Sequence, residues 1–79
     1  MIIEFTTHLD LPIAAIESKE ITHVDAKSFT FMGKQAHTLY VYVEQAKQEH
    51  YYAFCYDRAN ELQDGLKTFM SLWEKSKVN

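Results

Sequence analysis

Histidine and cysteine are the residue types of this chain best suited to metal binding and to nucleophilic catalysis. The four histidines, at positions 8, 23, 37 and 50, never stand at the HxH or HxxxH spacing of a local metal-ligand pair. The single cysteine, Cys55, has no CxxC partner. We therefore expect no metal site and no cofactor, with a zinc site assembled from distant strands as the alternative.

Cys55 could also act as a nucleophile, but only with a histidine such as His8 or His37 within hydrogen-bond distance. Its place in the segment AFCY, residues 53–56, instead predicts an interior strand in which the thiol is a small, buried and inert group. The acidic pairs Glu17 with Glu20 and Glu44 with Glu49 stand in predicted turns, and two glycines are too few for a phosphate-binding loop. The sequence therefore predicts a protein that is not an enzyme.

All five tyrosines stand between positions 40 and 56, in two aromatic-rich runs separated by a polar segment. Ranges 38–44 and 50–56 are rich in β-branched and aromatic residues, which predicts two strands joined as a hairpin. If Val43 faces Tyr51, one side of this hairpin carries small residues and the other carries large aromatic ones. The small side is Leu39, Val41, Val43, Ala53 and Cys55, and the aromatic side is Tyr40, Tyr42, Tyr52, Phe54 and Tyr56. A one-residue bulge would mix the two sets.

The elements that position these residues follow from the hydrophobic period. Further strands are predicted over about 2–7, 20–24 and 28–32, with turns at 25–27 and 33–36, and residues 9–20 are expected to form a short extended segment or a one-turn helix. After Asp57 the period becomes 3.6, which predicts a helix over about 58–76. Its apolar side carries Ala59, Leu62, Leu66, Phe69, Met70 and Trp73. We expect this helix to pack on the small side of the hairpin, because large residues fit best against small ones.

Gly65 stands at the edge of the helix's apolar side, where glycine costs about 1 kcal/mol relative to alanine. A close approach of the helix backbone to the sheet would compensate for this cost. The sequence thus predicts one α+β domain spanning residues 1–79, with an antiparallel meander of four or five strands, open or curled into a partial barrel, and one C-terminal amphipathic helix.

No predicted element covers the aromatic side of the hairpin, which leaves three interpretations. The sheet could curl so that these residues form a core with Ile3, Phe5, Phe29 and Phe31. The aromatic side could bind a protein, either a second copy or another partner, since tyrosine offers a large contact area at low entropic cost. It could also stack nucleobases, but the scattered lysines and the net charge of −3 make nucleic acid an unfavoured partner.

Composition fits an ordered domain, with 47% hydrophobic residues, and no run of about 18 apolar residues predicts a membrane span. One cysteine cannot form an internal disulfide, which fits the reducing cytoplasm where we expect the protein. We expect a non-enzymatic interaction module, an adaptor or an inhibitor of a larger protein, and its size would suit a protein of a phage or other mobile element that blocks a host enzyme. The alternatives are a ligand binder or small enzyme with a pocket lined by Tyr40, Tyr52, Phe54 and a histidine, and a single-strand nucleic-acid binder.

Overall fold

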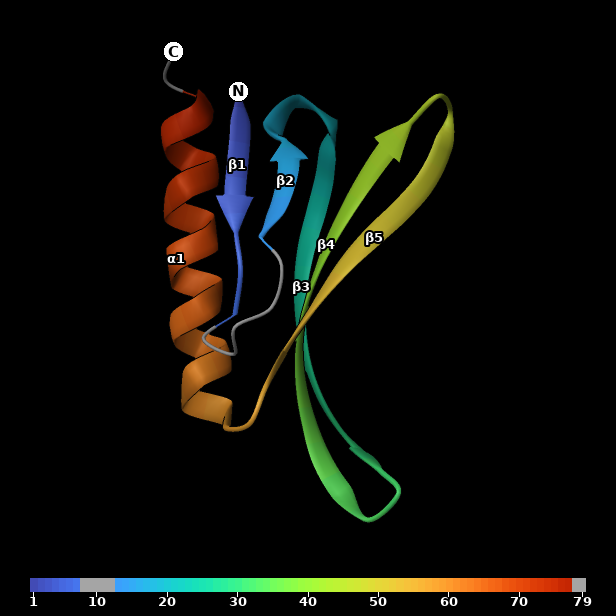
Figure 1. Cartoon of the computed structure of the whole chain (residues 1–79), viewed down its shortest axis with the longest axis vertical. Coiled ribbons are helices and arrows are strands. Elements are labelled where there is room, and N and C mark those ends of the chain that lie inside the picture. Colours follow the sequence, from blue (N-terminus) through green and yellow to red (C-terminus); the bar gives the residue numbers. More distant parts are fainter. Residues whose placement is uncertain (8–12, 78–79) are drawn as a thin grey trace.

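The chain forms five strands, one short 3₁₀-helix and one long α-helix in a computed structural model that describes residues 1–7 and 13–77. In chain order these are β1 (Ile2–Phe5), β2 (Ala14–Glu17), η1 (Ser18–Glu20), β3 (Ile21–Phe31), β4 (Lys34–Gln45), β5 (Gln48–Tyr56) and α1 (Ala59–Lys77). β1 pairs with β2, and β3, β4 and β5 form a three-stranded antiparallel meander (Figure 1). The predicted α+β class, with antiparallel sheet and one C-terminal helix, is confirmed.

The N-terminal ladder joins β1 to a strand that the sequence did not clearly indicate. Ile2 lies opposite Glu17 and Phe5 lies opposite Ala14. The Met1 ammonium group donates to Glu17 Oε1 at 2.8 Å, which closes the open end of the ladder. The segment predicted as extended therefore contains β2 and η1, while its first residues, 9–12, lie outside the described residues.

The two predicted strands 20–24 and 28–32 are one continuous strand, β3, so the predicted turn at 25–27 is wrong. Pairing with β4 runs without a break from His23 opposite Tyr42 to Phe31 opposite Lys34. The segment between the two predicted strands contains neither glycine nor proline, and the long strand β4 supplies backbone partners along its whole length. The turn that does follow is Met32-Gly33, two residues with positive φ, as a tight two-residue hairpin requires.

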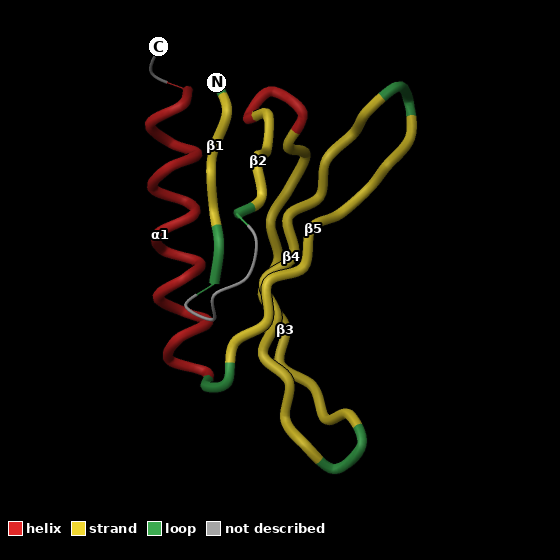
Figure 2. Tube along the Cα trace, in the orientation of Figure 1, coloured by secondary structure: helices red, strands yellow, loops and turns green. Residues whose placement is uncertain are grey.

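The core lies between the β3–β4–β5 sheet and a layer made of α1, β1 and β2 (Figures 1 and 2). We call the sheet face that points toward this layer the inner face. Leu39 and Val41 at its centre are 0% exposed. The ring of Phe5 meets the rings of Phe54 and Phe69 edge to face, with centroids 4.9 Å and 5.2 Å away, and so joins β1, β5 and α1.

At Gly65 the backbone of α1 lies against the side chain of Tyr56 from β5. A Cβ atom at this position would overlap the ring and hydroxyl of Tyr56, which lies buried against the helix backbone. Burial also raises the pKa of Tyr56 above the usual value for tyrosine. The predicted close approach at Gly65 is thus confirmed, and a side chain at the end of β5 makes it.

Candidate functional site: the outer face of the sheet

The hairpin of β4 and β5 has a different register from the predicted one. Tyr42 lies opposite Tyr51 and Val43 lies opposite His50, a shift of one residue. The predicted pairing of Val43 with Tyr51 implies a three-residue connection, whereas Gln45 pairs with Gln48 across the two-residue turn Ala46-Lys47. Both turn residues have positive φ, 50° and 65°, which neither residue type signals from the sequence.

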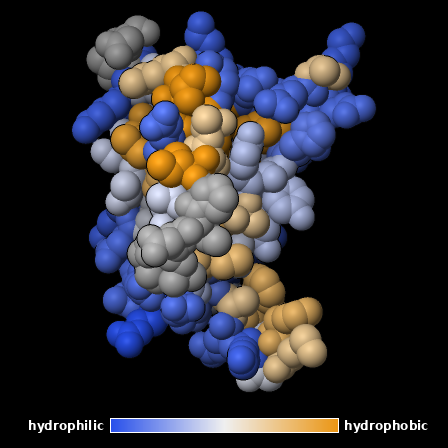
Figure 3. Space-filling view, viewed as in Figure 1, coloured by the Kyte–Doolittle hydropathy of each residue, from blue (hydrophilic) through white to orange (hydrophobic). Residues whose placement is uncertain are grey.

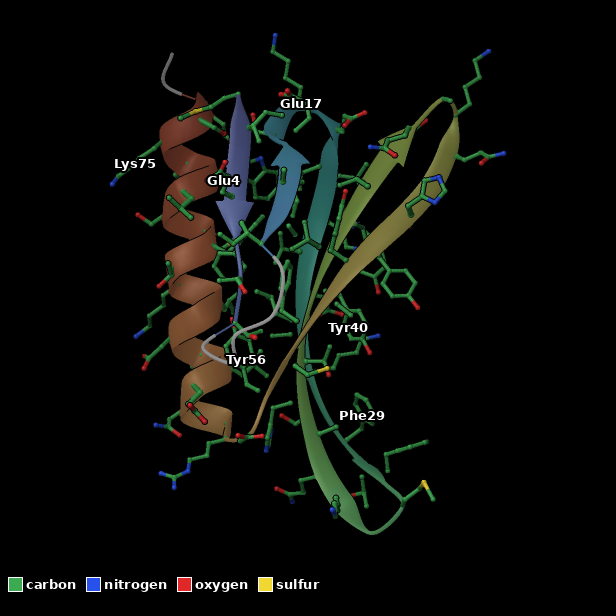
Figure 4. All side chains as sticks on the ribbon, in the orientation of Figure 1. Glu4, Glu17, Phe29, Tyr40, Tyr56 and Lys75 are labelled. Carbon is green, nitrogen blue, oxygen red and sulfur yellow. The ribbon has the colours of Figure 1, made fainter. Side chains whose placement is uncertain are left out.

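This shift divides the predicted aromatic side between the two faces of the sheet. Tyr52, Phe54 and Tyr56 point into the inner face, where Phe54 and Tyr56 are buried, so they belong to the core. Tyr40 and Tyr42 stay on the opposite face, which we call the outer face. Figure 4 shows Tyr40 on the side away from α1 and Tyr56 on the side toward it. The predicted pocket shared by Tyr40, Tyr52 and Phe54 therefore does not form.

The predicted small side is divided in the same way. Leu39, Val41 and Val43 are buried beneath the helix layer as expected. Ala53 and Cys55 are exposed on the outer face instead, so the prediction of a buried cysteine is wrong. The Cys55 sulfur lies 3.9 Å from the hydroxyl of Thr38, its cross-strand neighbour. No described histidine is hydrogen-bonded to this sulfur. Residues 1–7 and 13–77 therefore contain no cysteine–histidine pair in which the histidine could activate the thiol as a nucleophile.

Three tyrosines and a histidine form a connected aromatic group on the outer face, which we call the tyrosine cluster. The His23 and Tyr42 rings stack with centroids 4.1 Å apart. Tyr40, Tyr42 and Tyr51 contact one another at centroid distances of 5.7 to 6.1 Å. Tyr51 is 62% exposed, so this group presents ring surface to the outside instead of filling a core.

A second apolar group lies at the end of the β3–β4 hairpin. Alternation in the sequence SFTF places Phe29 and Phe31 on the outer face and leaves Ser28 and Thr30 on the inner one. The exposed fractions are 42% for Phe29, 64% for Phe31 and 86% for Met32 at the turn. Figure 3 shows this hairpin end as a hydrophobic area at the lower right, and Figure 4 shows Phe29 on the same side of the ribbon as Tyr40. We call these three residues the hairpin tip.

Small residues separate the tyrosine cluster from the hairpin tip. Ala36, Thr38, Ala53 and Cys55 occupy this middle zone, which is therefore lower than the aromatic groups at either side. Five charged groups lie on the same face. They are the ion pair of Asp25 with Lys27 (3.6 Å), Glu44 and its cross-strand neighbour Glu49 at one end, and Lys34 at the other.

Five members of this face were not assigned to it from the sequence: His23, Phe29, Phe31, Met32 and Tyr51. The signal for Phe29 and Phe31 was present, because both were expected on one side of a strand. What was missing was the continuity of β3, which places them on the same face as the tyrosines. Tyr51 was assigned to the helix-facing side by the one-residue error in register.

Other parts of the described chain offer less chemistry. A hollow beside the C-terminal half of α1 is lined by Ser18, Lys19, Ile21, Trp73, Ser76 and Lys77, with no acid, histidine or thiol among them. Within residues 1–7 and 13–77 no group of three His, Cys, Asp or Glu residues could hold a metal ion. In the same ranges, no helix has the length and apolarity needed to cross a membrane.

Comparisons of the chain with protein-family models, with curated proteins and with solved structures find no match.

Proposed function

We propose that the protein is a non-enzymatic interaction module that binds a larger protein through its outer face, as an adaptor or inhibitor acting in the cytoplasm. The observation that carries this proposal is the presence of two exposed aromatic and apolar groups, the tyrosine cluster and the hairpin tip, on one face of the sheet, with the small residues of the middle zone between them. None of the described elements covers these two groups, whereas α1, β1 and β2 cover the inner face. Apolar groups of this extent are typical of binding surfaces.

The composition of the face favours a protein partner. Tyrosine supplies a large and rigid contact area with a polar tip, and aromatic residues dominate the energetics of protein interfaces. Charge argues against nucleic acid, since Lys27 and Lys34 are outnumbered on this face by the acidic residues Asp25, Glu44 and Glu49. The exposed Cys55 at its centre fits a reducing compartment, where a free thiol persists.

The test compares two double variants with the unmodified chain. Tyr42→Ser with Tyr51→Ser removes the centre of the tyrosine cluster. Ile2→Ser with Ile13→Ser is the matched control, because both isoleucines are also exposed, 53% and 62%, but lie outside the outer face. Each immobilised chain is offered cell extract from the source organism, captured proteins are quantified by mass spectrometry, and urea unfolding reports stability.

We expect a protein that the unmodified chain and the isoleucine variant both capture, and that the tyrosine variant loses, with unfolding free energies that differ by about 1 kcal/mol or less. Capture that is unaffected by the tyrosine substitutions would contradict the proposal. So would a loss of stability of about 3 kcal/mol or more, since a change of that size marks the removal of core residues.

A further inference from the structure

The outer face is self-complementary, and we infer that it also pairs with the outer face of a second copy of this chain. The two sheets lie face to face with a two-fold axis that runs across the strands between Thr38 and Tyr40. This inference goes beyond the proposed function, because it assigns a second occupant, another copy of the chain, to the same face. Its first support is shape and its second is charge.

The order of large and small residues along β4 makes the outer face complementary to itself in shape. The described pairings place Lys34, Ala36, Thr38, Tyr40, Tyr42 and Glu44 in sequence on the outer face. A two-fold axis between Thr38 and Tyr40 sets Tyr40 against Thr38 of the second copy and Tyr42 against its Ala36. Along β4 both tyrosine rings are thus set against smaller side chains, Ala36 and Thr38, of which Thr38 is 3% exposed in the single chain, and close packing favours large against small. Along β3 the same axis sets Phe29 against His23 of the second copy.

The two ends of the outer face carry opposite charges. Under this axis Glu44 lies near Lys34 of the second copy, and Asp25 lies near its Lys27. The opposite arrangement, with the axis parallel to the strands, would bring Glu44 of both copies together. Aligned sheets cross at about 30°, so the end charges need not touch, yet their attraction still acts over about 10 Å at 0.1 M ionic strength.

The neighbouring carboxylates of Glu44 and Glu49 would be stabilised by a positive charge that another chain supplies. They are direct cross-strand neighbours, and like charges in this position destabilise an isolated sheet. Among the described residues neither carboxylate forms an ion pair, and the same holds for Lys34. A second copy placed as above supplies a lysine to the acidic end of each chain.

The size of the face places such a dimer among the smallest specific interfaces. The outer stretch of β4 from Lys34 to Glu44 is about 34 Å long, and three strands are about 14 Å wide. The flat area of this rectangle is about 480 Å² per copy, without the additional surface of the projecting side chains. Two copies together bury about 1,000 Å², the lower limit for a specific interface. We therefore expect a weak and reversible dimer, as is typical of interfaces at this lower limit.

The decisive experiment uses charge reversal at the two ends of β4. Glu44 and Lys34 are both exposed and stand at opposite ends of the strand, so within one chain they do not meet. Sedimentation equilibrium is run on the unmodified chain, on Glu44→Lys, on Lys34→Glu, and on an equimolar mixture of the two variants. Each variant alone sets like charges together twice in the dimer, which should weaken association about tenfold. The mixture restores opposite charges at both ends and should recover dimers at the unmodified level.

Cys55 provides a second measurement on the unmodified chain. Its thiol is exposed in the single chain and lies in the middle zone that the second copy covers. Labelling by a maleimide should therefore slow as the protein concentration passes through the dissociation constant, while the Tyr42→Ser, Tyr51→Ser variant should be labelled at one rate throughout.

Three results would overturn self-association: a chain that stays monomeric at high concentration, a dimer unaffected by the tyrosine and charge substitutions, or single charge variants that dimerise as well as the unmodified chain. The last result would indicate the parallel arrangement or another face. A monomeric chain that still captures another protein through its tyrosines would leave the proposed function intact. A dimer whose tyrosine variant captures the same proteins as the unmodified chain would instead remove the proposed function and keep the self-association.

Discussion

The two faces of the β3–β4–β5 sheet are built from alternate residues of the same strands, yet the rest of the described chain covers only one of them. The inner face carries Leu39, Val41 and Val43 on β4 and packs against α1, β1 and β2. The outer face carries Tyr40 and Tyr42 from the same strand, with ring surface left open. Aromatic content alone therefore does not identify the core of this domain. The connections contribute to the choice, because two residues join β5 to α1, and α1 lies with β1 and β2 on one side of the sheet.

Comparable residues on the two sides should respond very differently to the same substitution. Phe69 is 0% exposed and contacts Phe5 across the core, so Phe69→Ala should lower the free energy of unfolding by about 3–5 kcal/mol. Phe31 lies on the hairpin tip, and Phe31→Ala should change the free energy of unfolding by about 0.5 kcal/mol or less. Urea unfolding at a protein concentration too low for self-association measures both values.

A domain of this size has only a few kcal/mol of stability, so Phe69→Ala could prevent folding altogether. Phe69→Leu keeps most of the buried volume and should lose about 1.5 kcal/mol or less. The comparison between the faces would be contradicted if Phe31→Ala destabilised the chain as much as Phe69→Leu, because the hairpin tip would then be part of a core.

The contact of Tyr56 with α1 can be tested by filling the space at Gly65. Alanine is favoured over glycine in a helix by about 1 kcal/mol, but its Cβ atom would overlap Tyr56 here. We expect Gly65→Ala to lower the free energy of unfolding by about 1–3 kcal/mol, the usual cost of overfilling a packed site. Tyr56→Leu removes the hydroxyl and ring atoms that a Cβ atom at position 65 would overlap. In this background Gly65→Ala should become neutral or should stabilise the chain by up to about 1 kcal/mol. Equal effects in both backgrounds would show that Tyr56 does not limit this position.

Much of the fold could be predicted from periodicity. The change from period 2 to period 3.6 after Asp57 predicted α1 to within one residue at each end, and both strands of the β4–β5 hairpin were predicted to exist. The predicted turn at 33–36 is wrong in most of its length, because β4 begins at Lys34, four residues before the predicted strand, and pairs there with Phe31. Pairing that depends on distant partners could not be predicted in this way. β3 is one strand because β4 offers a partner at every position, and β2 is a strand because β1 lies beside it.

The candidate site depended on a single residue of register, which the sequence left undetermined. Ala46 and Lys47 adopt positive φ without the glycine or asparagine that normally marks such a turn. The period of a strand is two, so the resulting shift exchanged the faces of every residue on β5 and left β4 unchanged. Two of the five residues expected on the interaction face, Tyr40 and Tyr42, consequently remain there, while Tyr52, Phe54 and Tyr56 contribute to the inner face.

The smallest expected effect is a change in how the free energy of unfolding depends on pH when Tyr56 of the inner face is replaced, compared with Tyr51 of the outer face. Burial raises the pKa of Tyr56 in the folded state, because the phenolate would lose its hydration. The folded chain therefore holds this proton more tightly than the unfolded chain, for which the pKa is about 10. The stability that follows from this difference is fully present below pH 10 and is lost as the pH rises through the folded-state value.

Other groups titrate in the same range, so the measured quantity is the difference between the unmodified chain and Tyr56→Phe in urea unfolding at about pH 8 and about pH 11. We expect Tyr56→Phe to lose less stability over this interval than the unmodified chain, whereas Tyr51→Phe, which retains Tyr56, should lose as much as the unmodified chain. Equal losses in all three chains would show that the Tyr56 hydroxyl is hydrated in the folded state and that the inner face is open to water at this end of the sheet.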